Sequence, residues 1–331
     1  MESKKIFGIM LVSPVSGLPL IEKNNFLLSM KGEKFPIVNG IPRFISSDNY
    51  ASSFGLQWNT YKKIQLDSFT KTTISRDRLQ RLLGGSFDTV NGKTVLEAGC
   101  GAGRFTEVLL ANGAKVFAAD ISSAVDANFE NCHTYPNYFV CQADITALPI
   151  KPESFEVVIC IGVIQHTPDP EKTIAALCSY VRPGGLLIID HYTQGYHETP
   201  VRRILRAVLL RVPPRYSMSF TRGLTGLLWP VHKFLGSRKK NGLVRNTRNI
   251  FLFLSPLVDY YDAYPQLSEE QMKLWAMLDT HDTLTDRYKH LRSEQEIHDQ
   301  LESCGMENIR IIPGGNGIEA RAQKPTGSTR Q

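Results

Sequence analysis

The chain has 331 residues and a formal net charge of +6, with 42% hydrophobic and 21% charged residues, the composition of an ordinary globular protein. Its apolar runs fall short of the roughly 18 residues that a membrane-spanning helix needs. The six cysteines form no C-x-x-C pair, so the sequence argues against a disulfide framework and favours a protein of the reducing cytoplasm.

The first quarter of the chain has no strong helical or strand pattern over long stretches. Residues 1–45 contain short extended segments separated by turns, and we expect a small β module there. Residues 46–90 should form a linker with a helix over 74–83 that ends at Gly84-Gly85.

A glycine-rich turn follows the first strand predicted for the central region. Residues 94–96 form a short apolar run that leads through Glu97 into the turn 99–103, and residues 104–111 have a helical pattern. Glycines at such a turn let the backbone approach a ligand closely, because no Cβ stands in the way. Arg104 takes the place of the third glycine of a dinucleotide-binding G-x-G-x-x-G turn, which disfavours a nicotinamide cofactor.

Further strands are predicted, and polar side chains follow several of them. Residues 115–120 end in Asp120, at the distance from the glycine turn at which a βαβ unit delivers an acid to ribose hydroxyls. This pattern predicts an open parallel sheet that binds a ligand at the carboxyl ends of its strands. The other strands are predicted at 138–144, 155–161 and 186–190.

The regular alternation of strands and helices stops after residue 195. It returns at Ser293, which forms a capping-box helix start with Glu296, and two more strands are predicted at 308–312 and 317–322. Residues 196–290 are therefore an insertion between the fifth strand and the last helix. We expect the insertion to lie over the active edge of the sheet and to determine substrate specificity.

The basic character of the chain belongs to this insertion. From Thr199 to Val258 there are 12 Lys or Arg and no Asp or Glu, which leaves 26 basic and 32 acidic residues elsewhere. Three interpretations remain open: a solvated helical cap, recognition of an anionic substrate, or contact with an anionic membrane surface. The last is suggested by Leu227, Leu228 and Trp229 beside the charges.

The central region resembles a class I methyltransferase that depends on S-adenosylmethionine (SAM). The segments that carry the resemblance are 97–103, 120–122, 143–145, 162–170 and 182–185. It implies a Rossmann-like fold, with a doubly wound, mostly parallel sheet of seven strands. The cofactor would be SAM, converted to S-adenosylhomocysteine, and no metal is expected.

The resemblance also implies which residues meet SAM. The glycine turn would hold the methionine and ribose portion, Asp120 the ribose hydroxyls, and Asp144 with Ile145 the adenine. The segment from Ile161 to His166 would border the sulfonium and the substrate. A helix ahead of the turn often closes over the cofactor in this family, which makes Trp58 and Arg76 lid candidates. The remaining expected contacts are Glu97, Gly99, Cys100, Gly101, Ile121 and Gly162.

Residues 1–45 resemble a small zinc-ribbon module that precedes several methyltransferases. In that module two C-x-x-C knuckles bind the metal. Here the first knuckle falls on Ser13 and Ser16, and the second on Leu28 and Lys31, so all four ligands are missing. We expect a metal-free module that packs on the main domain, and an unrelated three-strand extension is the alternative.

The implied domains are a ribbon-like module (1–45), a helical lid (46–90), a SAM-binding core (91–195), a basic helical cap (196–290), the last core helix and strands (291–325) and a disordered tail (326–331).

Three histidines are candidates for the general base. His166 follows the fourth strand, His191 follows the fifth, and His281 lies beside Asp282 in the insertion. A histidine in any of these places can equally shape the site without moving a proton. The residues expected to contact substrate are Tyr192, Tyr260, Tyr261, His281 and Asp282.

The sequence therefore predicts methyl transfer to oxygen, with carbon the next choice. The acceptor is predicted to be a small molecule, saccharide or lipid precursor with an anionic group. Two alternatives stay open: an RNA methyltransferase, which the basic segment would serve, and a SAM-binding protein without catalysis. We expect the protein in the cytoplasm, with residues 199–258 able to reach a membrane surface.

Overall fold

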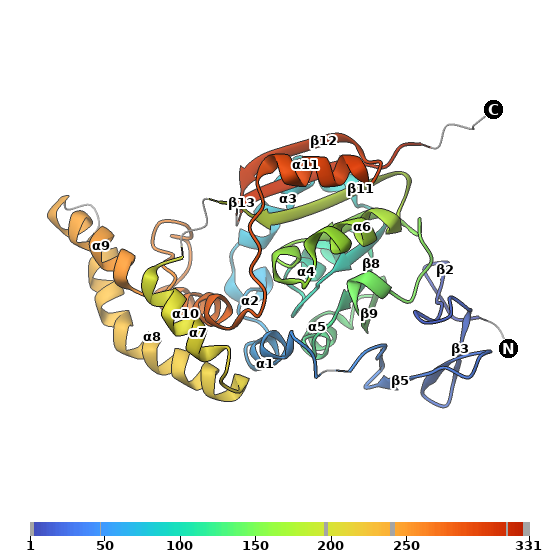
Figure 1. Cartoon of the computed structure of the whole chain (residues 1–331), viewed down its shortest axis with the longest axis horizontal. Coiled ribbons are helices and arrows are strands. Elements are labelled where there is room, and N and C mark those ends of the chain that lie inside the picture. The colour runs from blue at the N-terminus through green and yellow to red at the C-terminus, as the bar shows by residue number, and fades with distance from the viewer. Residues whose placement is uncertain (1–2, 47, 195–197, 239–241, 316, 327–331) are drawn as a thin grey trace.

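The computed structural model describes residues 3–46, 48–194, 198–238, 242–315 and 317–326. The predicted tail from residue 327 onward and Lys239 and Lys240 of the basic segment lie outside these residues. The core is a seven-stranded sheet with the order β12-β13-β11-β10-β7-β8-β9 (Figure 1). Its strands are β7 (Thr94–Ala98), β8 (Lys115–Asp120), β9 (Tyr138–Gln142), β10 (Phe155–Cys160), β11 (Val181–Tyr192), β12 (Glu307–Gly314) and β13 (Gly317–Gln323).

The order of the strands confirms the predicted doubly wound sheet. Five neighbouring strands pair in parallel, in the order β9, β8, β7, β10 and β11. Strand β13 pairs antiparallel with both β11 and β12. The winding reverses at β7, since β8 and β9 lie on one side of it and β10 and β11 on the other. In such a sheet the crevice outside the carboxyl ends at this reversal is where ligands bind.

Helices cover both faces of the sheet. Successive side chains of a strand point to opposite faces, so a strand that is apolar throughout has to be buried on both. Leu96 packs in one hydrophobic core, with side chains of α6 (Pro170–Tyr180) and α11 (Glu294–Ser303). Val95, its neighbour in β7, packs in the second core. The helices of the second core are α3 (Ile74–Leu82), α4 (Arg104–Ala111) and α5 (Val125–Cys132).

The N-terminal module lies beside β9, the edge strand of the large sheet (Figure 1). The amide of Phe44 donates to the carbonyl of Gln142 at 2.8 Å, and Arg43 forms a parallel bridge with Gln142. Leu11 and Leu20 from the module enter the core under the sheet. The module therefore covers an edge that would otherwise expose unpaired amides and carbonyls. Its strands are β1 (Lys5–Ile6), β2 (Ile9–Met10), β3 (Leu20–Lys23), β4 (Phe26–Ser29), β5 (Lys34–Val38) and β6 (Ile41–Pro42).

Hydrogen bonds to one carboxylate join two turns of this module. Ser13 Oγ accepts from the amide of Ser16 at 3.2 Å, and Ser16 Oγ donates to Glu33 Oε2 at 2.7 Å. Ser29 Oγ donates to the same Glu33 oxygen. The hydroxyls of Ser29 and Ser16 lower the pKa of Glu33, because they stabilise its charged form.

The second turn therefore differs from the predicted knuckle on Leu28 and Lys31. Leu28 lies in strand β4, where it pairs with Ile21, and Ser29 is the residue that reaches the carboxylate shared with Ser16. The resemblance of the module to a zinc ribbon stays a prediction.

The insertion is helical and extends to one side of the sheet (Figure 1). It contains α7 (Pro200–Leu209), α8 (Pro214–Ser237), α9 (Gly242–Leu254) and α10 (Glu269–Thr285). Helix α10 returns the chain to the core and packs against α7, α8 and α1 (Ser52–Thr60). A short helix, α2 (Asp67–Thr70), follows α1. Between the two helices, the carbonyl of Ile64 accepts a hydrogen bond from the indole of Trp275 on α10 at 2.7 Å.

His281 fastens α10 to two other helices. Its ring is fully buried, with Nδ1 2.6 Å from Gln57 Oε1 on α1 and Nε2 3.2 Å from Ser217 Oγ on α8. Burial lowers the pKa of His281 to about 4, because the charged ring would lose its hydration.

We predict that His281 makes stability depend on pH. A histidine in the unfolded chain has a pKa of about 6.5, so between that value and about 4 the unfolded state binds more protons than the folded one. Stability from this site is complete above pH 6.5 and is lost as the pH falls toward 4, by on the order of 2–3 kcal/mol.

Urea unfolding of the wild type and His281→Gln at several pH values measures this contribution. The difference in unfolding free energy between the two proteins should shrink as the pH falls from 7.5 to 4.5. Buried His191 has the same pKa direction in both proteins and cancels from the difference. A difference that stays constant with pH would contradict the prediction.

Candidate active site

A cavity of about 430 Å³ lies at the carboxyl ends of β7, β8, β10 and β11. The glycine turn contributes Gly99 and Gly101 to its wall, and the ends of β8 and β10 contribute Asp120 and Ile161. Helices α1 and α10 supply much of the opposite wall. The predicted contacts Glu97, Cys100, Ile121 and Gly162 also line the cavity.

The glycine turn needs glycine at Gly99 for a steric reason. The backbone has a φ of +80° there, and a Cβ at this position would lie 2.2 Å from Val163 Cγ2. The loop after β10 therefore packs directly on the turn. A side chain at this position would separate the two segments whose backbones form the floor of the cavity.

Asp120 is held in a single orientation at the end of β8. Its Oδ2 accepts from the Gly101 amide at 2.9 Å, and its Oδ1 accepts from the amide and hydroxyl of Ser122 at 2.8 and 2.7 Å. Burial raises the pKa of Asp120, and the hydrogen bonds oppose that shift. A fixed carboxylate with remaining lone pairs suits a diol such as the two ribose hydroxyls.

The cavity gathers further carboxyl groups. Burial raises the pKa of Glu97 to about 8, although Thr106 donates a 2.6 Å hydrogen bond to it. On α10, burial raises the pKa of Asp279 to about 6, and burial together with Asp279 raises that of Asp282. One buried oxygen of Asp282 has no hydrogen-bond partner among the described residues. Such a set of acids suits a cationic ligand, whose charge would favour their ionised forms.

Arg104 brings a guanidinium to the same cavity. Its Nε donates to Ser75 Oγ at 3.0 Å, and the guanidinium carbon lies 5.2 and 5.1 Å from the ring centroids of Phe105 and Trp275. Its Nη2 is buried and has no hydrogen-bond partner among the described residues. An unpaired guanidinium N–H group in a cavity is suited to bind a carboxylate of a ligand.

His166 lies where cofactor and substrate are expected to meet. Its Nδ1 is 3.2 Å from the carbonyl oxygen of Tyr288 and 3.4 Å from Asp286 Oδ2. Both neighbours are acceptors, so Nδ1 carries the proton, and a neutral ring then has its lone pair on Nε2. The rings of Phe54 and Tyr192 pack against the imidazole at 5.5 and 5.3 Å.

The structure places several other predicted residues at the cavity. Trp58 and Tyr192 line it, as do Tyr260 and Asp282 from the insertion. Trp58 and Phe54 are four residues apart on α1 and so share the helix face that looks into the cavity.

Both of the other predicted histidine bases lie outside the cavity lining. His191 is buried on β11, and its side chain points to the face of the sheet opposite to that of its neighbours Asp190 and Tyr192. Its Nδ1 is 2.8 Å from the carbonyl oxygen of Tyr192. Burial lowers the pKa of His191 to about 4. His281 packs between helices, as described above. Neither ring is in place to take a proton from a ligand in the cavity.

Four other expected contacts also lie outside the lining. Asp144 caps a short turn by accepting from the Thr146 amide at 2.8 Å, and Ile145 is buried in the hydrophobic core. Arg76 is exposed and lies over the Phe87 ring. Tyr261 stacks on Trp229, with ring centroids 6.0 Å apart.

Many residues of the lining were not predicted from the sequence, among them Arg78, Arg104, Tyr264, Trp275 and Asp279. Arg104 was noted only for breaking the dinucleotide pattern. Trp275 and Asp279 are four residues apart on α10, and Asp282 three further on, so a helical reading of 269–285 would have grouped them on one face.

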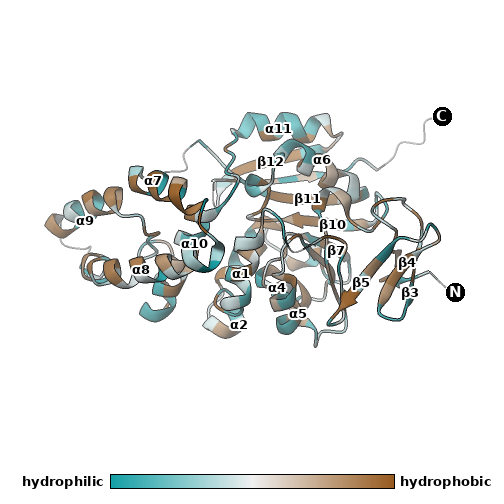
Figure 2. Ribbon diagram, turned by 60° about the horizontal axis from the view of Figure 1, so that its bottom comes forward, coloured by the Kyte–Doolittle hydropathy of each residue, from teal (hydrophilic) through white to brown (hydrophobic). Residues whose placement is uncertain are grey.

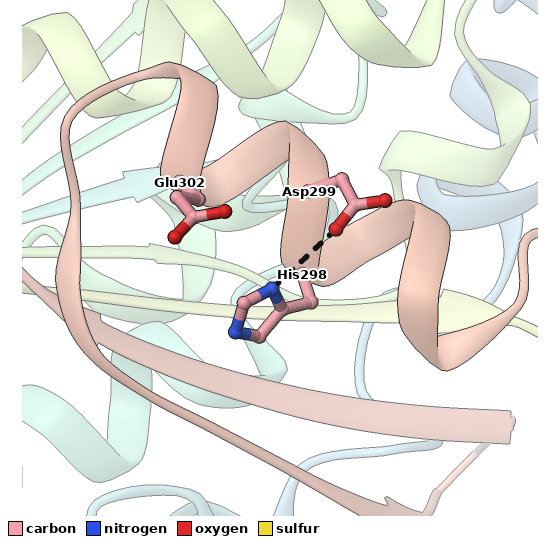
Figure 3. Close-up of side chains that lie close together, drawn as sticks. All are labelled: His298, Asp299 and Glu302. Carbon is pink, nitrogen blue, oxygen red and sulfur yellow. Dashed lines mark ion pairs between the residues drawn. The ribbon is translucent and has the colours of Figure 1, made fainter.

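A cluster of possible metal ligands lies apart from this cavity, on α11. His298 Nδ1 is 3.6 Å from Asp299 Oδ1, and Glu302 lies one turn away (Figure 3). Both carboxylates are exposed, and none of the three residues lines the cavity. Exposed acidic groups on a helix commonly occur without a metal, so the cluster is not part of the candidate site.

Comparison with curated proteins finds relatives among methyltransferases. A ubiquinone biosynthesis O-methyltransferase of Coxiella burnetii is 31% identical over 111 residues, 33% of this chain and 47% of that protein. Its counterpart in Pseudomonas fluorescens is 27% identical over 184 residues, 55% of this chain and 77% of that protein. The chain thus spans about half the length of the first of these relatives.

A SAM-dependent methyltransferase from Aquifex aeolicus superposes with a TM-score of 0.41 at 16% identity, over 75% of this chain and 88% of that one. Residues 96–189 match the family model described as a methyltransferase domain. Together with the order of strands in the sheet, this match identifies residues 96–189 as a class I methyltransferase domain, whose cofactor is SAM.

Proposed function

We propose that the chain transfers a methyl group from SAM to a hydroxyl oxygen of a small-molecule or lipid-precursor acceptor. The observation that supports this is a single cavity that joins the glycine turn and Asp120 to His166. SAM supplies a methyl group already activated by its sulfonium. The protein therefore has to align the acceptor, exclude water and remove one proton.

The charges of the cavity fit SAM as a ligand. Asp120 would hold the ribose hydroxyls, and the free Nη2 of Arg104 would hold the carboxylate of the methionine portion. Asp279 and Asp282 would face its cationic groups. These assignments would set the unpartnered Arg104 Nη2 and the unpartnered Asp282 oxygen against groups of opposite charge.

His166 fits the role of general base. With Nδ1 turned toward Tyr288 and Asp286, the lone pair on Nε2 is left to accept the proton of an acceptor hydroxyl. Asp286 is itself held by Arg206 at 2.7 Å and Lys289 at 3.3 Å, so it orients the ring from a fixed position. A base in this place favours oxygen as the nucleophile, because a hydroxyl must lose a proton during the transfer.

The lining also favours a particular acceptor chemistry. Rings from Phe54, Tyr192 and Tyr260 suit a flat or apolar acceptor. Arg202, whose guanidinium donates to the carbonyls of Pro256 and Leu257, brings positive charge to the wall for an anionic group. The relatives named for ubiquinone biosynthesis are O-methyltransferases, which agrees with a hydroxyl on such an acceptor.

We predict that Asp279→Asn weakens SAM binding about tenfold at pH 7.5, since a charge-assisted contact is worth about 1.5 kcal/mol or more. The pKa of Asp279 is raised to about 6, so the wild-type affinity should fall as the pH drops below that value. Calorimetric titration with SAM between pH 5.5 and 8 measures both effects. Asp77→Asn, on the exposed side of α3, is the matched control. Equal affinities for wild type and Asp279→Asn across this range would refute the role.

We predict that His166→Gln lowers kcat by about 10²-fold or more while the affinity for SAM is unchanged, because the base acts only on the acceptor proton. The pH dependence of kcat should flatten in the same variant. His133→Gln, at an exposed position, serves as the control. Wild-type turnover by His166→Gln would remove His166 from the mechanism.

The acceptor class is tested with SAM labelled in its methyl group, incubated with the protein and an extract of its native cell. Asp120→Ala provides the blank. Label in organic or small aqueous fractions would support the proposal and yield the product for identification. Label in a precipitate that ribonuclease removes would replace the proposal with an RNA methyltransferase. SAM binding without any labelled product, at all extract concentrations, would favour a non-catalytic protein.

A further inference from the structure

Helix α8 has an apolar stripe that the fold leaves exposed. Tyr216, Phe220, Leu227, Val231 and Phe234 follow one another at steps of three, four and seven residues, which places them on one side of the helix. The side chains that pack against the rest of the protein lie on the opposite side of α8. The exposed stripe is therefore a second apolar face and takes no part in the core.

The neighbouring helices add to this surface. On α7, Ile204 and Val208 are one turn apart, and Ile204 is 67% exposed. On α9, Leu243, Ile250 and Leu254 recur at helical spacing, and Leu243 is 79% exposed. Apolar segments of all three helices are visible where the insertion projects from the core (Figure 2). Helix α8 contacts α9, and α7 and α8 both pack on α10, so the three exposed apolar stripes belong to one helical unit. Exposed apolar stripes of this kind mark an interaction surface.

The charged residues that α7, α8 and α9 themselves contain are all basic. Residues 199–258 contain 12 Lys or Arg and no Asp or Glu. Arg206 and Arg248 are turned inward onto acids from other segments. Arg203 lies 4.0 Å from Glu198, and Lys233 lies 2.7 Å from Glu269. Arg211 and Arg215 are exposed beside the apolar side chains.

We propose that the surface of α7, α8 and α9, called here the cap surface, binds the face of an anionic lipid bilayer. Apolar side chains flanked by cations are what an interfacial helix needs, since the former enter the acyl boundary and the latter meet anionic headgroups. A second copy of the chain is disfavoured as the partner, because two such surfaces would bring like charges together.

The mode of binding is interfacial. Within the described residues, no helix is both long and apolar enough to pass through a membrane. Trp229, which the sequence suggested as a membrane contact, is buried against Tyr261 and contributes nothing to the cap surface. Leu227, in contrast, is 75% exposed. Binding to lipid is independent of methyl transfer, so either proposal can fail without the other.

Co-sedimentation of the full chain with vesicles tests the proposal. Vesicles of phosphatidylcholine alone are compared with vesicles that contain an equal part of phosphatidylglycerol, at low and high salt. We expect binding to the anionic vesicles that weakens with salt, and at least a tenfold loss of affinity in the double variant Leu227→Gln/Phe234→Gln. Arg211→Gln/Arg215→Gln should lose affinity for anionic vesicles in the same assay.

Met30→Gln changes an apolar residue that is 94% exposed in the N-terminal module, and it should bind as the wild type does. Circular dichroism and thermal unfolding verify that each variant is folded. Absence of binding to anionic vesicles, or equal binding by the double variant and Met30→Gln, would overturn the proposal. So would a wild-type dimer that the double variant converts to monomers, because a second copy would then cover the cap surface.

Discussion

A buried ion pair joins the helix before the glycine turn to the strands that carry the site. Arg78 on α3 donates from Nη2 to Asp190 Oδ2 at 2.5 Å, and the other Asp190 oxygen accepts from the Gly162 amide at 2.5 Å. Removing one partner of a buried pair costs about 3–5 kcal/mol. Asp190 thus fixes α3, the end of β11 and the loop that leads to His166 in one arrangement, and the cavity wall depends on it.

The insertion completes the cavity from the other side through one face of α10. Trp275, Asp279 and Asp282 lie on that face, while His281 points away and holds the helix to α1 and α8. Residue 281 is adjacent to 282 in the sequence, yet neighbours on a helix diverge by about 100°. One side of α10 therefore presents carboxyl groups to the cavity, and the other side packs against α1 and α8.

Local patterns were enough to predict the sheet, the glycine turn, Asp120 and the capping box at Ser293. Each depends on residues close together in the chain. The wrong predictions concerned residues whose side chains point to another face of the strand or helix than expected. His191 alternates away from the site on β11, and Arg78, two positions from the predicted Arg76, is the α3 arginine at the cavity. Which side chain faces the cavity is determined by packing between segments that are far apart in the chain, and a single sequence does not show that packing.

The acids of α10 and most of the cations of the cap lie on different helices. The inner wall of the cap presents Asp279 and Asp282 to the cavity, whereas its outer surface is basic and apolar. Helix α7 belongs to both, because Arg202 lines the cavity and Ile204 faces outward. An α-helix is about 10 Å across, so a bilayer on the cap surface would lie roughly one helix from the cavity wall.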